Sequence, residues 1–417
     1  SEIIRGWELS SPGVWKVVLP SSFFGAFNPY KDVISGDWFF GGPDNHLGEV
    51  FLNGRPLFQT SDMKQVENPK REEEARDPER STWTWLCIVD EKQTTIYANF
   101  HDQNPNENLT EISVRNTCFY PEETGCDYIT VRGFHMSQAA TQWAAPTAEQ
   151  VGLIGTNWSK GWIIEDNVVS DSKCVGITLG KDRKTGNNGV DYNEMVHRVI
   201  ANGWNKDHIG SHMVRRNSIS RCGEAAICGS FGAAYSQIVE NEVYDIYVNR
   251  PYWGAEIGGI KIHGAIDVSI RRNRVHNAYI GIWLDWMAQG TRVSENLCYE
   301  NDYVDFFPEV DHGPYLVDNN LLLSPFSIKD WSQGGAYVHN LVAGMVSRAE
   351  QGRETPYFKP HSTEFVAIKN IPGGDTRFYN NIFVGVGNGA PFKRSKYLPG
   401  DSVDPKSGYG IFMYNHA

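Results

Sequence analysis

The sequence lacks several features that would place it in a familiar class. Its seven cysteines are an odd number and form no Cys-x-x-Cys pair, so we expect neither a zinc site nor a disulfide scaffold, and reduced thiols favour the bacterial cytoplasm. No apolar run approaches the length of about 18 residues that a membrane-spanning helix needs, so no membrane partner is expected. Acidic residues outnumber basic ones by 50 to 38, giving a net charge of −12. This charge excludes the basic footprint typical of a nucleic-acid-binding protein.

Aromatic residues, by contrast, are abundant. The 417 residues include 13 Trp, 19 Tyr and 20 Phe, and 40% of the chain is hydrophobic. This hydrophobic content excludes a disordered chain, and the length is sufficient to bury a sizeable core. Trp and Tyr beside carboxylates suit a neutral, ring-shaped ligand such as a sugar.

The first part of the chain has the pattern of short antiparallel strands. Residues 48–55 form a strand that ends in an Asn-Gly hairpin signal, and residues 81–85 and 94–100 alternate with period two. We therefore predict an inserted, β-sandwich-like domain over residues 31–120. Residues 1–30 are expected to begin the repeat that resumes at residue 121 and continues to residue 417.

An asparagine repeat dominates the sequence after about residue 125. Each Asn has an apolar or aromatic residue three positions before it and an apolar one two positions after it. A period near 22 residues, doubled where a copy is hidden or a loop inserted, predicts a solenoid, and Asn at a fixed corner indicates a parallel β-helix in which the Asn side chains stack. A sandwich of independent hairpins would instead space its strands by about 8–12 residues. The predicted ladder comprises Asn167, Asn217, Asn241, Asn273, Asn296, Asn319, Asn340 and Asn380.

A second strand follows each Asn corner, and these strands align with one another. Their alternation sends one column of apolar side chains inward and the neighbouring columns outward. The predicted inward column is Ile177, Ile227, Ile260, Ile282 and Phe306. One outward column contains Lys261, Trp283 and Phe307. The next contains His263, Asp285 and Glu309.

Asp285 and Glu309 are the candidate catalytic residues because they occupy equivalent positions one coil apart. Neighbouring coils lie about 4.8 Å apart, so their carboxyl groups should be on the order of 5 Å apart. A retaining glycosidase needs roughly 5–5.5 Å between its two carboxyls, whereas an inverting one needs roughly 6.5–9.5 Å. Two stacked carboxylates also repel, so one should keep a proton near neutral pH, as a general acid must.

Several neighbours of this pair are candidates for substrate binding. Trp283 and Trp286 flank Asp285 and could stack on a sugar ring, and Glu256 could accept bonds from sugar hydroxyls. Lys261 and His263 lie one coil below, where they could bond a hydroxyl or Asp285, or could equally be buried structural residues.

Histidines and acids also gather in one insertion of the repeat. His197, His208 and His212 lie near Asp191 and Asp207, but their spacing matches no metal-ligand signature such as His-Glu-x-x-His. A loop and short helix that pack on the solenoid explain this stretch more simply. We therefore predict no metal and no other cofactor.

Three long runs resemble glycoside hydrolase family 120. They are GIWLDWMAQGTR at residues 281–292, FPEVDHGP at 307–314 and AEIGGIKIH at 255–263. That family comprises retaining β-xylosidases built on a right-handed parallel β-helix interrupted by a β-sandwich. Its chains are longer, so we expect this one to lack material at both ends.

The resemblance implies a role for each matching residue. Asp285 corresponds to the nucleophile and Glu309 to the acid/base, while Glu256 and Lys261 fall where the family contacts the terminal xylose. The similarity covers most of the chain, including residues 48–54 and 83–100. The remaining candidates for substrate binding are His263, Trp283, Trp286 and His312.

The sequence thus predicts an all-β, exo-acting β-xylosidase that releases terminal β-1,4-linked xylose from xylo-oligosaccharides by double displacement. We also expect a homo-oligomer. Two alternatives stay open: another β-helix enzyme of the polygalacturonase or pectate lyase type, and a non-catalytic sugar-binding β-helix. A galacturonate substrate would need cationic anchors, and the nearest pair, Arg271 and Arg272, sits at the Asn corner.

Overall fold

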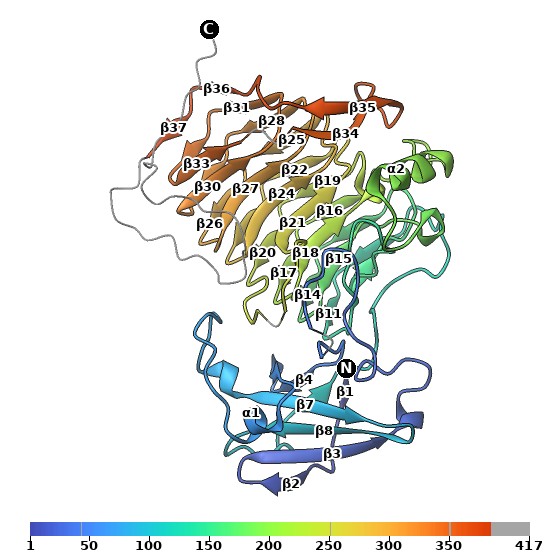
Figure 1. The fold of residues 1–417 in the computed structure, drawn as a ribbon, viewed down its shortest axis with the longest axis vertical. Coiled ribbons are helices and arrows are strands. Elements are labelled where there is room, and N and C mark those ends of the chain that lie inside the picture. The colour runs from blue at the N-terminus through green and yellow to red at the C-terminus, as the bar shows by residue number, and fades with distance from the viewer. Residues whose placement is uncertain (43, 251, 350–351, 385–417) are drawn as a thin grey trace.

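Two β-rich parts make up the chain, as Figure 1 shows. The computed structural model describes residues 1–42, 44–250, 252–349 and 352–384. A small domain at the bottom of the view carries the N-terminus, and a tall stack of parallel strands rises above it. The two parts are called the small domain and the solenoid below.

The small domain contains two antiparallel-rich sheets around one apolar core. Trp7, Val17, Trp85 and Phe100 are buried in that core. A short helix, α1 (Met63–Glu67), packs on the larger sheet. The strands of the smaller sheet, in order, are β1 (Glu2–Ile3), β9 (Thr110–Ile112), β4 (Val50–Leu52) and β5 (Arg55–Pro56). Those of the larger sheet are β2 (Glu8–Ser11), β3 (Val14–Pro20), β8 (Gln93–Asn99), β7 (Thr84–Val89) and β6 (Phe58–Gln59).

The expectation that residues 1–30 begin the solenoid is wrong. Strand β1 pairs antiparallel with β9, and β3 pairs along its whole length with β8, so both belong to the small domain. Period-two alternation marks a strand but does not identify its partner, because only the tertiary fold decides which edge it joins. The residues of the predicted solenoid segment beyond 384 lie outside the described part of the chain.

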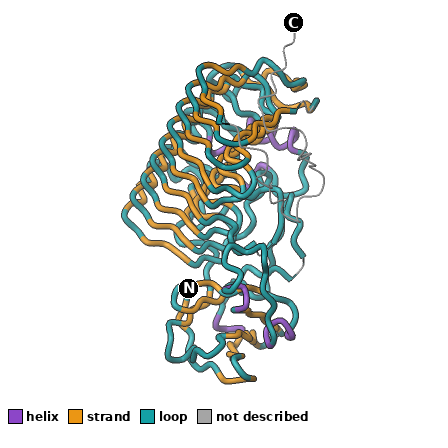
Figure 2. The backbone as a smooth tube through the Cα atoms, turned by 90° about the vertical axis from the view of Figure 1, so that its left-hand side faces the viewer, coloured by secondary structure: helices purple, strands orange, loops and turns teal. Residues whose placement is uncertain are grey.

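The solenoid consists of three parallel sheets whose strands repeat in strict rotation. Figure 2 shows the coils stacked one above another when the molecule is viewed from its side. The first sheet contains β10 (Thr130–Arg132), β13 (Ile163–Glu165), β16 (Met213–Arg215), β19 (Gln237–Val239), β22 (Ser269–Arg271), β25 (Thr291–Ser294), β28 (Tyr315–Asp318), β31 (Gly335–Val338) and β36 (Arg377–Tyr379). The second contains β11 (His135–Ser137), β14 (Val168–Ser170), β17 (Ser218–Ser220), β20 (Glu242–Tyr244), β23 (Arg274–His276), β26 (Leu297–Tyr299), β29 (Leu321–Leu322), β32 (Leu341–Val342) and β37 (Ile382–Phe383).

The third sheet contains the strands that follow each Asn corner, on which the sequence analysis placed the candidate catalytic residues. It contains β12 (Ile154–Gly155), β15 (Val175–Thr178), β18 (Ala225–Gly229), β21 (Gly258–His263), β24 (Ile280–Asp285), β27 (Val304–Glu309), β30 (Phe326–Asp330) and β33 (Met345–Arg348). The predicted class, an all-β parallel β-helix with an additional antiparallel domain, is therefore confirmed.

Asparagine side chains form a ladder at the corner between the first and second sheets. Asn217 illustrates the repeat: its Nδ2 donates to Asn241 Oδ1 at 2.9 Å and to the Ile164 carbonyl at 2.9 Å. Each rung thus satisfies buried backbone groups of the turn. The ladder comprises Asn167, Asn217, Asn241, Asn273, Asn296, Asn320, Asn340 and Asn381.

The predicted rungs Asn319 and Asn380 are wrong by one residue. In each Asn-Asn pair the second residue joins the ladder, as the bonds of Asn320 and Asn381 demonstrate. The first residue takes the left-handed backbone that precedes every rung, with φ of 56° at Asn319 and 50° at Asn380. Asn tolerates that conformation well, so residue type alone could not distinguish the two positions.

The inward column of the third sheet fills the solenoid core as predicted. Ile177 pairs with Ile227, and the column continues through Ile260, Ile282 and Phe306 to Ile328. All of these side chains are completely buried. Since the register is fixed by this column, the outward-facing residues are fixed with it.

Two insertions cover part of the outer face of the third sheet. They are helix α2 (Tyr192–Ala201) and the antiparallel hairpin β34 (Arg353–Phe358) and β35 (Phe365–Ile371). Both pack in one apolar cluster with Trp204 and Met287. Single 3₁₀ turns occur at Ser21–Phe23, Arg80–Thr82, Arg183–Thr185 and Phe231–Ala233.

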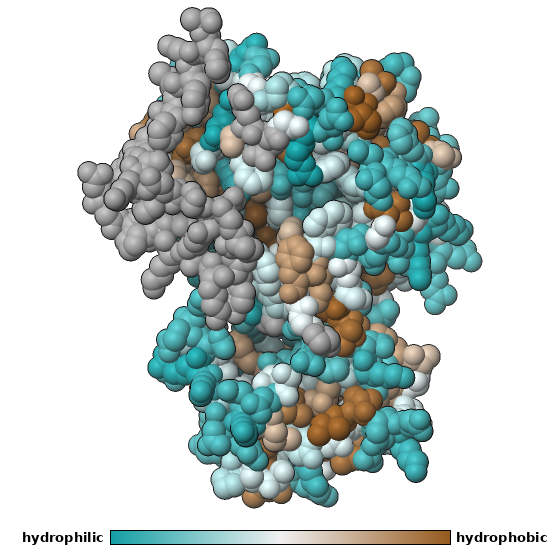
Figure 3. All heavy atoms as spheres, viewed as in Figure 1, coloured by the Kyte–Doolittle hydropathy of each residue, from teal (hydrophilic) through white to brown (hydrophobic). Residues whose placement is uncertain are grey.

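The face drawn in Figure 3 is largely hydrophilic, with some apolar areas. Within the described residues, no helix has both the length and the apolar character that crossing a membrane requires.

Candidate active site

The outward residues of three consecutive strands, β21, β24 and β27, line a cavity of about 260 Å³. Asp285 ends β24 and Glu309 ends β27. The two residues are direct partners in the strand register, so neighbouring coils present their carboxyl groups side by side. The predicted adjacency of this pair along the sheet is therefore present.

Glu309 is held in place by its strand neighbours. The indole Nε1 of Trp283 donates to Glu309 Oε2 at 3.1 Å, and the Trp286 amide donates to the Glu309 carbonyl at 3.0 Å. Burial and, next, the negative charge of Asp285 raise the pKa of Glu309 to about 8. Glu309 is therefore protonated at neutral pH in the free protein, which is the state that a general acid needs.

Lys261 supplies the positive charge at the centre of the site. Its Nζ lies 2.5 Å from Glu256 Oε2 and 3.1 Å from Asp285 Oδ2, and it donates to the Ala255 carbonyl at 3.0 Å. It also lies 3.5 Å from the centre of the Trp283 ring. Although burial opposes the charge, the Glu256 and Asp285 carboxylates hold the pKa of Lys261 above its ordinary value.

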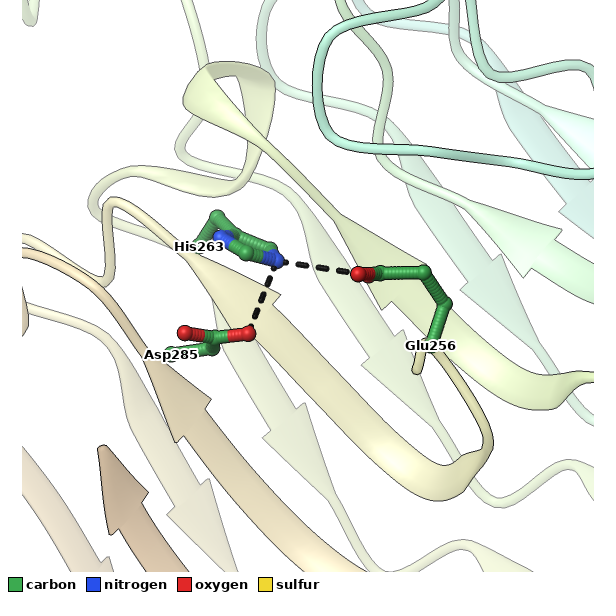
Figure 4. A group of neighbouring side chains, drawn as sticks. All are labelled: Glu256, His263 and Asp285. Atoms are coloured by element: carbon green, nitrogen blue, oxygen red, sulfur yellow. Dashed lines mark hydrogen bonds and ion pairs between the residues drawn. The ribbon is translucent and has the colours of Figure 1, made fainter. Parts of the chain in front are cut away.

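His263 joins the same cluster, as Figure 4 shows. Its Nε2 lies 3.2 Å from Asp285 Oδ2 and 3.4 Å from Glu256 Oε2. The imidazole packs edge-on against Tyr192 of helix α2, with ring centres 5.7 Å apart. His263 also lines the cavity, so it both braces Asp285 and faces the ligand space.

Glu256, His263 and Asp285 offer three ligand atoms within 4.8 Å of one another, which is a spacing that a metal ion could use. The Lys261 ammonium already contacts both carboxylates. It supplies the positive charge that a metal would bring, so a metal-free site stays our prediction.

The histidines of the other sequence cluster are not brought together as ligands. Asp191 caps helix α2 by accepting from the Glu194 amide at 3.1 Å. His212 is buried in the solenoid, where its Nδ1 accepts from the Trp162 amide at 3.1 Å. Burial lowers the pKa of His212 to about 3, so this imidazole is neutral. These residues have structural roles.

Aromatic rings form much of the cavity wall. Trp283 and Phe307 stack along the sheet with ring centres 5.4 Å apart, and Trp286 packs edge-on against Tyr192 at 5.0 Å. Rings of this kind bind the apolar face of a sugar while polar groups bind its edge. The aromatic lining residues are Trp38, Tyr192, Trp253, Tyr279, Trp283, Trp286, Tyr303, Phe307 and Trp331.

Several residues of this lining, including Lys329, Trp331 and Trp38, escaped the sequence analysis. Lys329 and Trp331 lie one coil beyond Phe307 and Glu309, and extending the strand alignment by one copy, through Ile328, would have found them. Trp38, Tyr192 and Arg353 come from insertions that carry no period, so no sequence signal pointed to them.

Arg353 stands at the mouth of the cavity near the acid/base candidate. Its Nη1 lies 4.0 Å from Glu309 Oε1, and its guanidinium lies 4.7 Å from the centre of the Trp286 ring. The side chain is partly exposed and belongs to the first residue of β34. Its positive charge favours the carboxylate form of Glu309 and so opposes the effect of burial.

His312 is not brought together with the other predicted site residues. It lies outside the lining of the catalytic cavity and borders a different hollow, near Gln333 and Tyr357. Its Nε2 contacts the Thr355 carbonyl at 3.0 Å and the Thr355 Oγ1 at 3.0 Å. His312 therefore braces the hairpin that carries Arg353, which is a structural contribution.

Fold and site together define a class: a parallel β-helix protein that holds paired carboxyl groups in an aromatic pocket of the size suited to a sugar. Comparison with known proteins sharpens this class. Residues 4–112 match the model of the glycoside hydrolase 120 insertion domain.

The solved structure of XylC in complex with xylose is 48% identical to this chain, with a TM-score of 0.89. The match covers 92% of this chain and 64% of the XylC chain, so the sequence spans about two-thirds of that relative's length. A search of curated proteins finds no match. The chain belongs to glycoside hydrolase family 120.

Proposed function

We propose that this protein is a retaining, exo-acting β-xylosidase that releases terminal β-1,4-linked xylose from xylo-oligosaccharides. The pairing of Asp285 with Glu309 on adjacent strands of an aromatic pocket carries the proposal. Strand spacing places such groups about 5 Å apart, in the range that retaining glycosidases use. The similarity to XylC, whose solved complex holds xylose, supports the choice of sugar.

In the first step, Asp285 attacks the anomeric carbon and forms a covalent glycosyl ester, while Glu309 protonates the departing glycosidic oxygen. The raised pKa of Glu309 keeps the required proton in place at neutral pH. Because Trp283 donates to Oε2, the proton is carried on Oε1.

In the second step, Glu309 removes a proton from water, which attacks the ester and regenerates Asp285. Formation of the ester removes the negative charge of Asp285, and that charge is one cause of the raised pKa of Glu309. The pKa of Glu309 therefore falls, and the same residue changes from acid to base. Two displacements at one carbon retain its configuration.

The remaining polar groups position the sugar. Glu256 and Lys261 lie beside Asp285 and can bond the hydroxyls of the terminal xylose, and His263 completes this polar edge. Trp283 and Trp286 offer ring faces and edges beside the reacting carbon.

The nucleophile is tested by Asp285→Asn on an aryl β-xyloside. We expect turnover to fall by about a thousandfold or more, because the amide cannot form the ester intermediate. Glu300→Gln, an exposed corner residue outside the cavity, is the matched control and should keep full activity. Near-normal activity of the Asn variant would end the proposal, as would wild-type activity on polygalacturonate alone, or binding of xylobiose without hydrolysis.

The acid/base is tested by Glu309→Ala. We expect turnover of xylobiose to fall by about 10²–10⁴-fold. Azide should restore activity on an activated aryl xyloside and give a β-configured xylosyl azide, because the small anion needs no general base. Proton NMR of the first xylose released by the wild type should show the β anomer, and an α anomer would contradict a retaining mechanism.

A further inference from the structure

One segment of the small-domain sequence lies on the solenoid. Residues 33–42, called the arm below, fall within the stretch that matches the insertion-domain model. Yet Ile34 is buried in the solenoid core cluster, and Phe39 bridges antiparallel to Gly254. Figure 1 shows the dark-blue chain rising from the small domain beside the solenoid. The arm therefore connects the small domain to the part of the chain that carries the site.

Asp37 fixes the arm to the solenoid through several bonds. Its carboxylate accepts from the Gly189 amide at 2.9 and 2.8 Å and from Thr147 Oγ1 at 2.5 Å. Its carbonyl accepts from Trp143 Nε1 at 2.9 Å, and its amide donates to Asn188 Oδ1 at 3.1 Å. These contacts reach two separate loops of the solenoid, around residues 143–147 and 188–189, so they fix the backbone at the next residue.

Trp38 follows Asp37 in a left-handed conformation, with φ of 60°. That conformation is unfavourable for a non-glycine residue, so the surrounding bonds must hold it. The Trp38 carbonyl accepts from the Ala255 amide at 2.9 Å, directly beside Glu256. The side chain lines the catalytic cavity and remains 40% exposed.

The position of Trp38 indicates at which end of the substrate its ring lies. Glu309 must face the leaving group, so the leaving group lies toward β27 and the next coil. The terminal sugar then lies over Asp285 and Glu256, on the side where the Trp38 backbone joins residue 255. A ring at that end blocks a further sugar unit beyond the terminal one.

We propose that Trp38 is a specificity-determining residue that closes the non-reducing end of the cavity and restricts cleavage to single xylose units. Asp37 is the positioning residue that holds the ring there. The inference rests on the proposed function and adds to it a role for the arm: the insertion supplies a wall of the active site.

The test compares Trp38→Gly with the wild type on xylotetraose labelled at its reducing end. Glycine removes the ring and also fits the positive φ, so the fold should be preserved. The wild type should release only xylose, leaving labelled xylotriose. We expect the Gly variant to release xylobiose as well, leaving labelled xylobiose, and to show a KM for xylobiose about tenfold higher. Trp38→Phe, which keeps a ring, should give an intermediate result.

Phe40→Ala is the matched control, because Phe40 belongs to the same arm, is 59% exposed and lies outside the cavity lining. It should leave the products and KM unchanged. Asp37→Ala should raise KM and release some xylobiose, while kcat on an aryl xyloside changes little.

Release of xylose alone by Trp38→Gly, with an unchanged KM, would overturn the inference. If the wild type itself releases no xylose from xylotetraose, the proposed function fails instead, so the two failures are distinguishable.

Discussion

Glu309 combines two opposing influences in one side chain. Burial and the Asp285 charge raise its pKa, while Lys261, Lys329 and Arg353 lower it. The balance leaves the group protonated at neutral pH but close enough to its titration to give the proton up during the cycle.

This balance predicts the alkaline limb of the pH profile. As the pH rises through the pKa of Glu309, the free protein loses the proton that the first step needs. We therefore expect kcat/KM on xylobiose to fall above pH about 8, rather than above the ordinary Glu value of 4.5. A pH profile at constant ionic strength checks this, and a limb near pH 5 would contradict the assignment of Glu309 as the acid.

Arg353 leads to a second prediction, which concerns the direction in which the alkaline limb of the pH profile moves. Its guanidinium, 4.0 Å from Glu309 Oε1, stabilises the carboxylate form. Replacing it in Arg353→Met removes that stabilisation, so the alkaline limb should move to higher pH, while Arg353→Lys should keep it near the wild-type position. Profiles of kcat/KM for the three proteins measure the shift, and a limb that moves to lower pH in the Met variant would contradict this electrostatic role.

The Asn ladder offers a prediction for a structural element. Asn320 is completely buried, and its side chain donates to the Val293 carbonyl at 2.9 Å and to Asn340 Oδ1 at 2.9 Å. Asn320→Ala leaves several buried polar groups without a hydrogen-bond partner. Each such group lowers the free energy of unfolding by about 1–3 kcal/mol. We expect a drop of several kcal/mol in the free energy of unfolding, measured by chemical denaturation.

Asn319 is the matched control for that variant. It is exposed and has a φ of 56°, so Asn319→Gly keeps the backbone conformation and should change stability by about 0.5 kcal/mol or less. Equal effects at the two positions would mean that the ladder contributes little.

The elements that repeat could be predicted from the sequence, whereas those that occur once could not. The inward column through Ile260 and Ile282 repeats with a fixed side-chain period, so the register of Asp285 against Glu309 followed from counting. The arm with Trp38 and the hairpin with Arg353 have no second copy to compare with. Their contacts with the site are decided by tertiary packing, which local patterns do not encode.

At the scale of the whole molecule, charged residues join the small domain to the solenoid. Arg76 donates to Asn277 Oδ1 at 2.7 Å, and Glu49 lies 3.7 Å from the Nζ of the buried Lys173. Glu49 and Lys173 border a second cavity, of about 270 Å³, between the two parts. Burial raises the pKa of Glu49 to about 7, with Lys173 opposing the shift.

The raised pKa of Glu49 predicts how stability changes with pH. The folded protein binds this proton more tightly than the unfolded chain, so the contribution of Glu49 is lost as the pH rises from about 4.5 to 7. Glu49→Gln resembles the protonated form and should be more stable than the wild type at pH 8 but similar at pH 5. Denaturant midpoints at the two pH values check this, and a Gln variant equally stable relative to wild type at both would contradict it.

Oligomeric state also belongs to this scale. The expected homo-oligomer stays a prediction, which light scattering of the purified protein would test.

The regular stacking of the coils fixes the distances between catalytic groups on the solenoid. Two outward residues at equivalent positions can be separated only by whole multiples of about 4.8 Å. One coil, as between Asp285 and Glu309, gives the distance of a covalent mechanism. Two coils would give roughly 9.6 Å, at the edge of the range in which a water fits between the carboxyls and the configuration inverts. The stereochemical outcome in such a scaffold is therefore a discrete choice of coil rather than a continuous adjustment of side chains.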